Sequence, residues 1–525
     1  MSKQTPWMFS LLAAGCFLAG CPTSSSNGPD PETDAVTTEP DADPETDGGT
    51  DGPDVDPETD GGTDEPAVAP DDYNFESRFG DGSSVSYSGQ TNRHALIRGL
   101  KNYIGNINDT TFQAGQTADD VKAALRYFTD YKNQGGDGSD AVPYNFTDVS
   151  GAAVDAAQGT YGDIGSPASL EEKLPDIDVE FGTARWSNGY GVIGYSDNTL
   201  LPSAVLDSML TELATMIAAR ADGTIETDPE GVQIQKTYVS GAGVDYQQLI
   251  QKFLDGAVTY SQGTDDYMDD DLEGKGLLSD NVNQVEKNGS LKSYTALEHV
   301  WDEGFGYFGA ARDYDTYTDD EIAAKGGRDE YAKGFFDSDN DGEIDLKSEL
   351  NQGHSVNAAK RDRGAMIATD YTQQAFDAFV AGRHLIATAG ELDTEELNDL
   401  RDYRDTAHDA WEKAIAATVV HYINDVLQDM ANFDTYDYNF AAHAKHWSEA
   451  KGFALSLQFN PRAALDRTQL QRLHDALGVS PVLPNAEAQV ISDYKDGLND
   501  AKTLLQAAYS FDADNMGDAN GFNGW

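Results

Sequence analysis

Cysteine is almost absent from this sequence of 525 residues. The only two cysteines, Cys16 and Cys21, lie within the first 21 residues. The rest of the chain therefore contains no disulfide bond, no zinc site with cysteine ligands and no cysteine nucleophile.

Common catalytic motifs are also missing. The sequence contains neither the H-E-x-x-H pattern of zinc peptidases nor the G-x-S-x-G pattern of serine hydrolases. It also lacks the G-x-x-x-x-G-K-[ST] loop that binds nucleotide phosphates. Whether the protein is an enzyme stays open at this point, and these absences favour a protein that is not.

Basic residues are scarce, with 35 Lys and Arg against 92 Asp and Glu, and the net charge is -57. Residues 22–72 hold 17 of the acidic residues and no basic one, yet residues 73–525 still have a net charge of -41. A field of this sign repels phosphate backbones and attracts cations. Nucleic acid is therefore excluded as a partner, and most of the carboxylates are interpreted as a solvated surface.

The first 21 residues resemble an export signal. The apolar run over residues 7–20 is too short to span a bilayer, as in a secretory signal peptide. Leu18-Ala19-Gly20-Cys21 resembles a bacterial lipobox, which implies cleavage before Cys21, lipidation of its sulfur and anchoring by acyl chains. Pro22 after the cysteine favours, by the same resemblance, an outer-membrane lipoprotein facing the periplasm or the cell surface. The alternative is an ordinary secretion signal that ends near Cys21.

Residues 22–72 form a low-complexity segment. The sequence Asp-Pro-Glu-Thr-Asp-Gly-Gly-Thr-Asp begins at Asp43 and again at Asp56. A segment with so few apolar side chains and charge of one sign cannot bury enough surface to fold, and its self-repulsion extends it. We therefore predict a disordered acidic tether.

Residues 73–525 are predicted to form one large helical domain. Apolar residues recur with helical spacing in ten segments, namely 92–103, 118–128, 204–220, 245–254, 294–308, 356–387, 394–432 (with a break), 440–457, 467–477 and 486–509. Because Val and Ile are sparse in these segments, we expect an all-α, multi-helix bundle rather than an α/β sheet. We expect two quasi-repeated halves, at about 73–335 and 353–525. Residues 134–235 are rich in Gly, Ser and Asp and are predicted to be an irregular insertion, with short strands at 179–181 and 190–195.

A calcium-type loop is predicted at residues 337–349, between the two halves. Acidic residues follow the spacing of an EF-hand loop, and Gly342 occupies the position of its sharp turn. The candidate ligands are Asp337, Asp339, Asp341, Glu343, Asp345 and Glu349. The pattern departs at position twelve, which is Ser348, so Glu349 reaches the ion only with a one-residue bulge. The alternative is a solvated acidic turn.

Two segments share the pattern Trp-x-Glu-x-x-Gly, beginning at Trp301 and at Trp447. If the first segment is helical, one of its faces carries two potential metal ligands, His299 and Glu303. One face of the second segment carries three, His443, His446 and Glu449. Imidazole with carboxylate suits iron, zinc or copper, and helical bundles build such sites from facing helices. The alternative is a His-Glu pair that braces helix packing.

Four motifs resemble those of the domain of unknown function 4856 family. They are SVSYSGQTNRHALI (84–97), HVWDEGFGYFG (299–309), DSDNDGEIDLKSEL (337–350) and AKHWSEAKGFALSLQFNP (444–461). The resemblance implies a bacterial envelope protein, often a lipoprotein. Where the family has a second histidine in its first motif, this chain has Val300.

The family resembles the imelysin-like proteins more distantly, and His446 and Glu449 fit their H-x-x-E motif, although Ala444 stands where they have Gly. That resemblance implies a helical bundle linked to iron uptake or peptidase activity. We therefore expect an envelope lipoprotein that binds a metal or another ligand without catalysis, in iron acquisition. The alternatives are a metal-dependent hydrolase, and a structural or adhesive protein with stabilising calcium only.

Overall fold

The computed structural model describes residues 69–131, 144–165, 169–175 and 191–525. The chain separates into Met1–Pro66 and Ala67–Trp525, and the described residues belong to the second unit, which is compact. The predicted signal peptide with Cys21, nearly all of the predicted tether and the predicted strand at 179–181 lie outside the described ranges.

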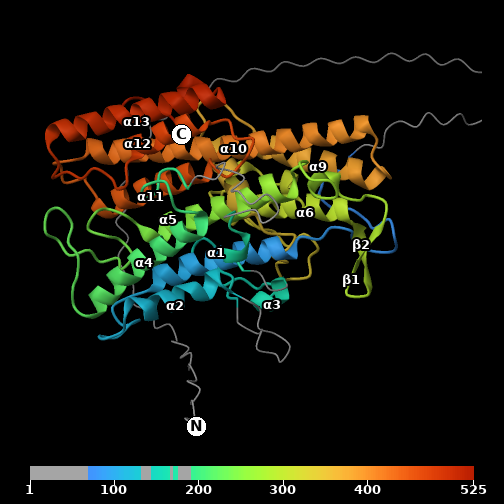
Figure 1. Cartoon of the computed structure of the whole chain (residues 1–525), viewed down its shortest axis with the longest axis horizontal. Helices are drawn as coiled ribbons and strands as arrows, with labels where there is room; N and C mark the ends of the chain where they lie inside the picture. Colours follow the sequence, from blue (N-terminus) through green and yellow to red (C-terminus); the bar gives the residue numbers. More distant parts are fainter. Residues whose placement is uncertain (1–68, 132–143, 166–168, 176–190) are drawn as a thin grey trace, which may run out of the picture. The chain divides into compact units, whose positions relative to one another are not determined.

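The described part of the chain is mostly helical, which confirms the all-α prediction (Figure 1). Its helices are α1 (Ser88–Asn106), α2 (Ala118–Thr129), α3 (Tyr161–Ile164), α4 (Pro202–Ala221), α5 (Tyr246–Leu254), α6 (Ala296–Phe308), α7 (Asp319–Ile322), α8 (Gly353–Gly364), α9 (Tyr371–Thr388), α10 (Thr394–Ala431), α11 (Phe440–Ser456), α12 (Arg467–Leu477) and α13 (Ala488–Tyr509). A two-stranded antiparallel hairpin, β1 (Gln284–Lys287) and β2 (Ser290–Thr295), precedes α6. No described helix is both long enough and apolar enough to cross a membrane.

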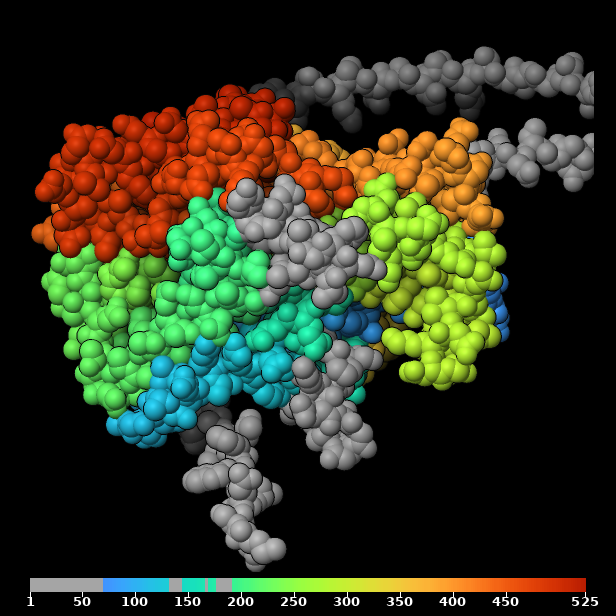
Figure 2. All heavy atoms as spheres, viewed as in Figure 1, coloured from blue at the N-terminus to red at the C-terminus, as the bar shows by residue number. Residues whose placement is uncertain are grey.

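The helices lie in stacked rows around the long helix α10 (Figure 1). Helix α10 packs against α8, α9, α11 and α13, while α11 packs in turn against α5, and α5 against α1. In the space-filling view, the segments from α10 onward (orange to red) cover one edge, and α2 and α4 (cyan to green) lie toward the opposite edge (Figure 2). Helix α5 therefore connects the C-terminal helices to α1.

Side-chain caps set several helix starts. Thr295 and Glu298 form a reciprocal capping box at the start of α6, and Asp393 and Glu396 form another at the start of α10. Each box satisfies backbone N–H groups that have no partner within the helix. The predicted starts of α2 at 118, α10 at 394 and α12 at 467 agree with the structure because their caps are encoded locally.

The single helix predicted over 356–387 is wrong, since α8 ends at Gly364 and α9 begins at Tyr371. The carboxylate of Asp362 accepts hydrogen bonds from the backbone N–H groups of Tyr371 and Thr372, at 3.0 and 2.9 Å. A residue near the end of α8 thus caps the first turn of α9, and this contact between two helices leaves no trace in the periodicity.

Three other local expectations also differ from the structure. The break predicted inside 394–432 is absent, because α10 runs unbroken to Ala431. The described part of the predicted strand at 190–195 is not a strand. The hairpin lies instead at β1 and β2, where Asn288 and Gly289, both with positive φ, form a turn that favours two-residue hairpins.

A π-helical stretch continues α5 over Asp255–Tyr260 and Gln262–Tyr267. π-Helical turns are rare, and they occur frequently at functional sites. Sequence periodicity predicts only that a helix ends near 254, so this feature was not expected.

Three tryptophans, Trp301, Trp411 and Trp447, are almost fully buried in the core. The indole N–H of Trp301 donates to the carbonyl oxygen of Phe379, and that of Trp447 donates to the carbonyl oxygen of Leu477, each at 2.9 Å. Both copies of the Trp-x-Glu-x-x-Gly pattern therefore anchor their tryptophan on the backbone of a later segment. The two quasi-repeated halves stay a prediction.

Candidate functional site

The first Trp-x-Glu-x-x-Gly copy holds His299 and Glu303 close together on α6, as its spacing predicts. The Nε2 atom of His299 lies 3.8 Å from Oε1 of Glu303, which also accepts a hydrogen bond from Gln90 at 2.9 Å. The Nδ1 atom of His299 lies 2.9 Å from the carbonyl oxygen of Ser86, and its ring stacks on Tyr294. These contacts fix the orientation of the imidazole and join α6 to the segment before α1.

The same copy supplies a buried ion-pair cluster that the sequence analysis missed. Asp302, whose side chain is fully buried, lies 2.8 Å from Nε of the equally buried Arg383. Asp302 also accepts hydrogen bonds from the hydroxyl of Tyr73 and the backbone N–H of Ser86. Glu298 lies 3.3 Å from Arg383 as well. The cluster joins α6 to α9. Asp302 stands in the first copy, between His299 and Glu303, and Glu298 directly precedes His299.

The second copy does not bring its predicted ligands together. Nδ1 of His446 lies 2.8 Å from Asp429 on α10, and its Nε2 lies 3.9 Å from Asp425. His443 instead faces the hydroxyl of Tyr438, at 3.2 Å. Glu449 lies 3.4 Å from Lys445 and is almost fully buried. The three candidates therefore have separate partners.

The calcium-type loop places three of its six candidates together. Side-chain oxygens of Asp337, Asp339 and Asp341 lie within 4.8 Å of one another, the only such set of three His, Cys or acidic residues among the described residues. Glu349 folds back onto the loop, where its carboxylate accepts hydrogen bonds from Ser338 and from the backbone N–H of Asp345.

The other candidates of the loop have different surroundings. The carboxylate of Asp345 accepts from Gln158, Lys347 and Ser348, so protein donors already satisfy it. Glu343 is exposed. Three carboxylates suit a hard divalent cation such as calcium, which completes its six to eight oxygen ligands with carbonyl groups and water.

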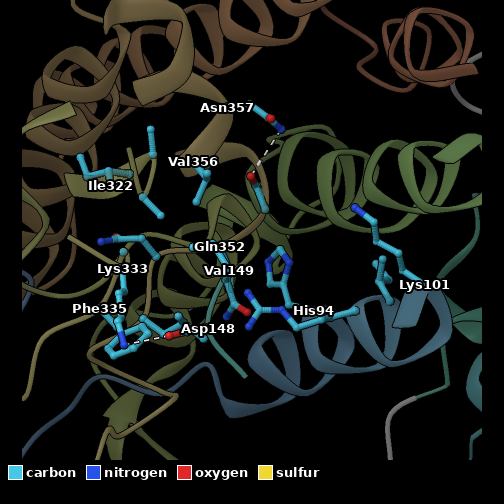
Figure 3. A pocket seen from close by; sticks show the side chains of 18 of the residues that line it. His94, Lys101, Asp148, Val149, Ile322, Lys333, Phe335, Gln352, Val356 and Asn357 are labelled. Carbon is cyan, nitrogen blue, oxygen red and sulfur yellow. Dashed lines mark hydrogen bonds and ion pairs between the residues drawn. The ribbon is translucent and has the colours of Figure 1, made fainter. Parts of the chain in front are cut away.

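A pocket of about 420 Å³ lies between α1, the start of the π-helical stretch, α8 and the segments that flank the calcium-type loop (Figure 3). This volume falls in the range of small-molecule sites. Its basic and acidic lining residues are Arg98, Lys101, Lys252, Lys333, Lys360, Asp148 and Asp255. Five cations therefore meet in one pocket of a chain that has only 35 basic residues.

The five cations differ in their partners. Lys333 forms an ion pair with Asp148 at 2.8 Å, and Lys252 donates a hydrogen bond to Gln251 at 3.1 Å. The guanidinium of Arg98 lies over the ring of Phe146. Within the part of the chain that the structure describes, the ammonium groups of Lys101 and Lys360 have neither an ion-pair nor a hydrogen-bond partner. These two lysines are the cations that remain available to a ligand.

The charged groups of the pocket shift one another's pKa values. Burial, with the charge of Lys252, lowers the pKa of Lys101 to about 7 and that of Lys360 to about 8. Burial raises the pKa of Asp255 to about 6, although nearby Lys252, Lys101 and Arg98 oppose the shift. The lysines are therefore close enough to repel one another, and an anion between them relieves that repulsion.

A buried amide also lines the pocket. Asn351 is only 3% exposed, and its Oδ1 accepts from the backbone N–H of Ala311, while its Nδ2 has no hydrogen-bond partner among the described residues. An unpaired buried donor costs free energy.

The helices that carry the two Trp-x-Glu-x-x-Gly copies contact residues that line the pocket. A Cβ atom at Gly452 of the second copy would clash with the Cβ of Lys252, so this glycine lets α11 approach α5 closely. The carbonyl oxygen of Tyr307, on the helix of the first copy, lies 3.2 Å from Nε2 of His94, which lines the pocket. Sequence reasoning found these motifs but not the lysines, which come from three helices far apart in the chain.

The fold and site together define an all-α protein with a basic pocket in an acidic body. The chain belongs to the family described as "Domain of unknown function (DUF4856)", whose family model matches residues 206–475. No curated protein and no solved structure matches the chain.

Proposed function

We propose that this protein is a non-catalytic binding protein of the bacterial cell envelope, anchored through a lipid at Cys21, and that its pocket binds a small anion. The observation that carries the proposal is the pair of unpartnered lysines, Lys101 and Lys360, in a pocket with three more cations. Two of the other charges, Lys333 and Asp148, neutralise each other. Small-molecule sites combine such a cavity with a few convergent polar groups.

Calorimetric titration of the purified chain with small anions tests this proposal, using inorganic phosphate, benzoate and phenyl phosphate as probes. We expect one-to-one binding of at least one probe, weakened about tenfold or more by Lys101→Gln plus Lys360→Gln, because a hydrogen bond to a charged group contributes about 1.5–3 kcal/mol. The control is Lys275→Gln plus Lys287→Gln, which removes the same charge from exposed positions outside the pocket. Binding to none of the probes, or equal losses in both double variants, contradicts the proposal.

The predicted roles of transition metals and iron are tested separately. Elemental analysis of protein purified without added metal should find iron, zinc or copper if His446 and Glu449 act as ligands, and His446→Ala should then lower that content. Peptide turnover that is lost in Glu449→Ala would support the hydrolase alternative instead. Calcium as the sole bound metal, with no bound anion, would favour a structural protein.

The predicted lipid anchor is tested by a separate measurement. Mass spectrometry of the protein from membranes should find the chain beginning at a diacylated Cys21, and Cys21→Ala should release it into the soluble fraction. Recovery of the unmodified chain in membranes would contradict anchoring through this residue.

A further inference from the structure

Gln352, directly before α8, places an unpartnered amide in the pocket. Its side chain is only 8% exposed, and Figure 3 draws it near the middle of the pocket. Its backbone N–H donates to Gly309 and its carbonyl oxygen accepts from Ser355. Within the described ranges its side chain neither caps α8 nor has any other hydrogen-bond partner, and both polar atoms of the amide keep access to solvent. One acceptor and two donor hydrogens are therefore available to a ligand.

Other uncharged polar side chains line the same pocket. Asn102 on α1 and Thr147 have no side-chain hydrogen bond among the residues that the structure describes. Asn357 on α8 makes one bond of 3.4 Å, from its amide nitrogen to the carbonyl oxygen of Gly353. The lysines of the pocket are thus accompanied by neutral groups that can both donate and accept hydrogen bonds.

The large apolar side chains of the lining offer little surface to a ligand. Phe146, Phe335 and Ile322 are at most 8% exposed, because they pack into the hydrophobic core. Polar atoms form most of the accessible surface of the pocket. A ligand body that cannot form hydrogen bonds would leave these polar groups without partners, which costs free energy.

We infer that the ligand is a hydroxylated organic anion of the size of a sugar phosphate or a sugar acid. Its acidic group binds Lys101 and Lys360, and its hydroxyl groups exchange hydrogen bonds with the amide of Gln352. A hydroxyl both donates and accepts, as an amide does, so the two groups are complementary. The pocket volume of about 420 Å³ lies toward the lower end of small-molecule sites, which suits a single sugar unit. The inference rests on the proposed function and narrows its ligand class.

Binding of three phosphates to the intact chain tests this inference. Glucose 6-phosphate should bind about tenfold more tightly than phenyl phosphate or inorganic phosphate, because each hydrogen bond between neutral groups contributes a factor of a few. Gln352→Met keeps the length of the side chain and removes its amide. It should weaken glucose 6-phosphate about threefold to tenfold and leave inorganic phosphate unchanged, whereas Lys101→Gln plus Lys360→Gln should weaken all three.

The matched control is Gln489→Met, at an exposed position on α13 outside the pocket, which should change no affinity. The comparison of ligands in the unsubstituted chain decides the matter even if Gln352→Met does not fold. If phenyl phosphate binds as tightly as glucose 6-phosphate and both depend on the lysines, recognition of hydroxyl groups is excluded and the proposed anion site stands. Equal effects of Gln352→Met and Gln489→Met would overturn the contact with Gln352. If no phosphate depends on the lysines, the proposed function fails as well.

Discussion

Two histidines on one turn of α11 have opposite responses to pH. Burial lowers the pKa of His443 to about 4. Burial also disfavours protonation of His446, but the hydrogen bond and charge of Asp429, with the charge of Asp425, outweigh it and raise the pKa of His446. The ordinary pKa of histidine, about 6.5, lies between these cases.

The two shifts predict opposite effects on the free energy of unfolding. The unfolded chain binds a proton at His443 more readily than the folded chain, so His443 costs stability as the pH falls from 6.5 to about 4. His446 contributes stability that is complete below pH 6.5 and is lost as the pH rises through its raised pKa. His443→Gln should therefore reduce the acid sensitivity, and His446→Gln should destabilise more at pH 6 than at pH 9, as urea titrations would show. Parallel pH profiles for both variants would contradict this assignment.

Among the ion pairs of α6, the buried pair of Asp302 and Arg383 should cost the most stability when one partner is replaced. Arg383→Met leaves Asp302 without its cation in a fully buried site, which costs about 3–5 kcal/mol of stability. The matched control is Arg363→Met, which breaks the exposed pair with Asp320 and should cost about 1 kcal/mol or less. Denaturant unfolding measures both, and similar losses in the two variants would contradict the ranking.

Sequence reasoning at this scale finds residue types but not their partners. The spacing of His446 and Glu449 was visible, yet Asp429, which holds the imidazole, lies on another helix. Lys101, Lys252 and Lys360 were not selected because each is an ordinary helical lysine until α1, α5 and α8 meet. Composition made a basic pocket improbable in a chain of net charge -57.

At the scale of elements, the sequence locates helices well where caps and periodicity agree. Helix α12 runs over Arg467–Leu477 as predicted, because Asp466 and Gln469 form a local capping box. The division of α8 from α9 depends on Asp362, whose role appears only when the two helices are packed. Local signals therefore predict helix starts, and tertiary contacts decide the rest.

The calcium-type loop is an element that can be tested by itself. Calcium should raise the melting temperature, because an ion that binds only the folded state stabilises it by mass action. Asp337→Ala plus Asp341→Ala should abolish the rise, since the two residues contribute to the convergent carboxylates. The charge-matched control, Asp496→Ala plus Asp500→Ala on the exposed side of α13, should keep it. Equal responses in both variants would exclude the loop.

For the whole molecule, the excess of acidic residues limits which anions reach the pocket. Charges separated by more than about 10 Å are largely screened at ordinary salt, so the local cations dominate inside the pocket. Outside it, the acidic surface repels large polyanions more strongly than small anions. The fold thus favours small ligands.

Anion affinity should depend on pH through the lysines. An anion favours the protonated forms of Lys101 and Lys360, whose pKa values are about 7 and 8, so binding takes up protons and weakens as the pH rises from 7 to 9. Other charges also shift the pKa values in the pocket, namely those of Lys252, Arg98, Asp255 and Glu449. Lys101→Arg, which stays charged, should flatten the profile of phenyl phosphate binding. A flat profile in the unsubstituted chain would contradict this coupling.

The assembly of the pocket from distant segments also determines when it forms during folding. Its walls come from residues 94–102, 146–149, 251–255 and 322–360, so it exists only after these distant stretches have met. Helices α9, α10 and α11 are successive in the chain, and their pairing closes short loops, which costs less entropy than joining α5 to α11. During refolding, the circular dichroism of the helices should therefore return before the capacity to bind an anion.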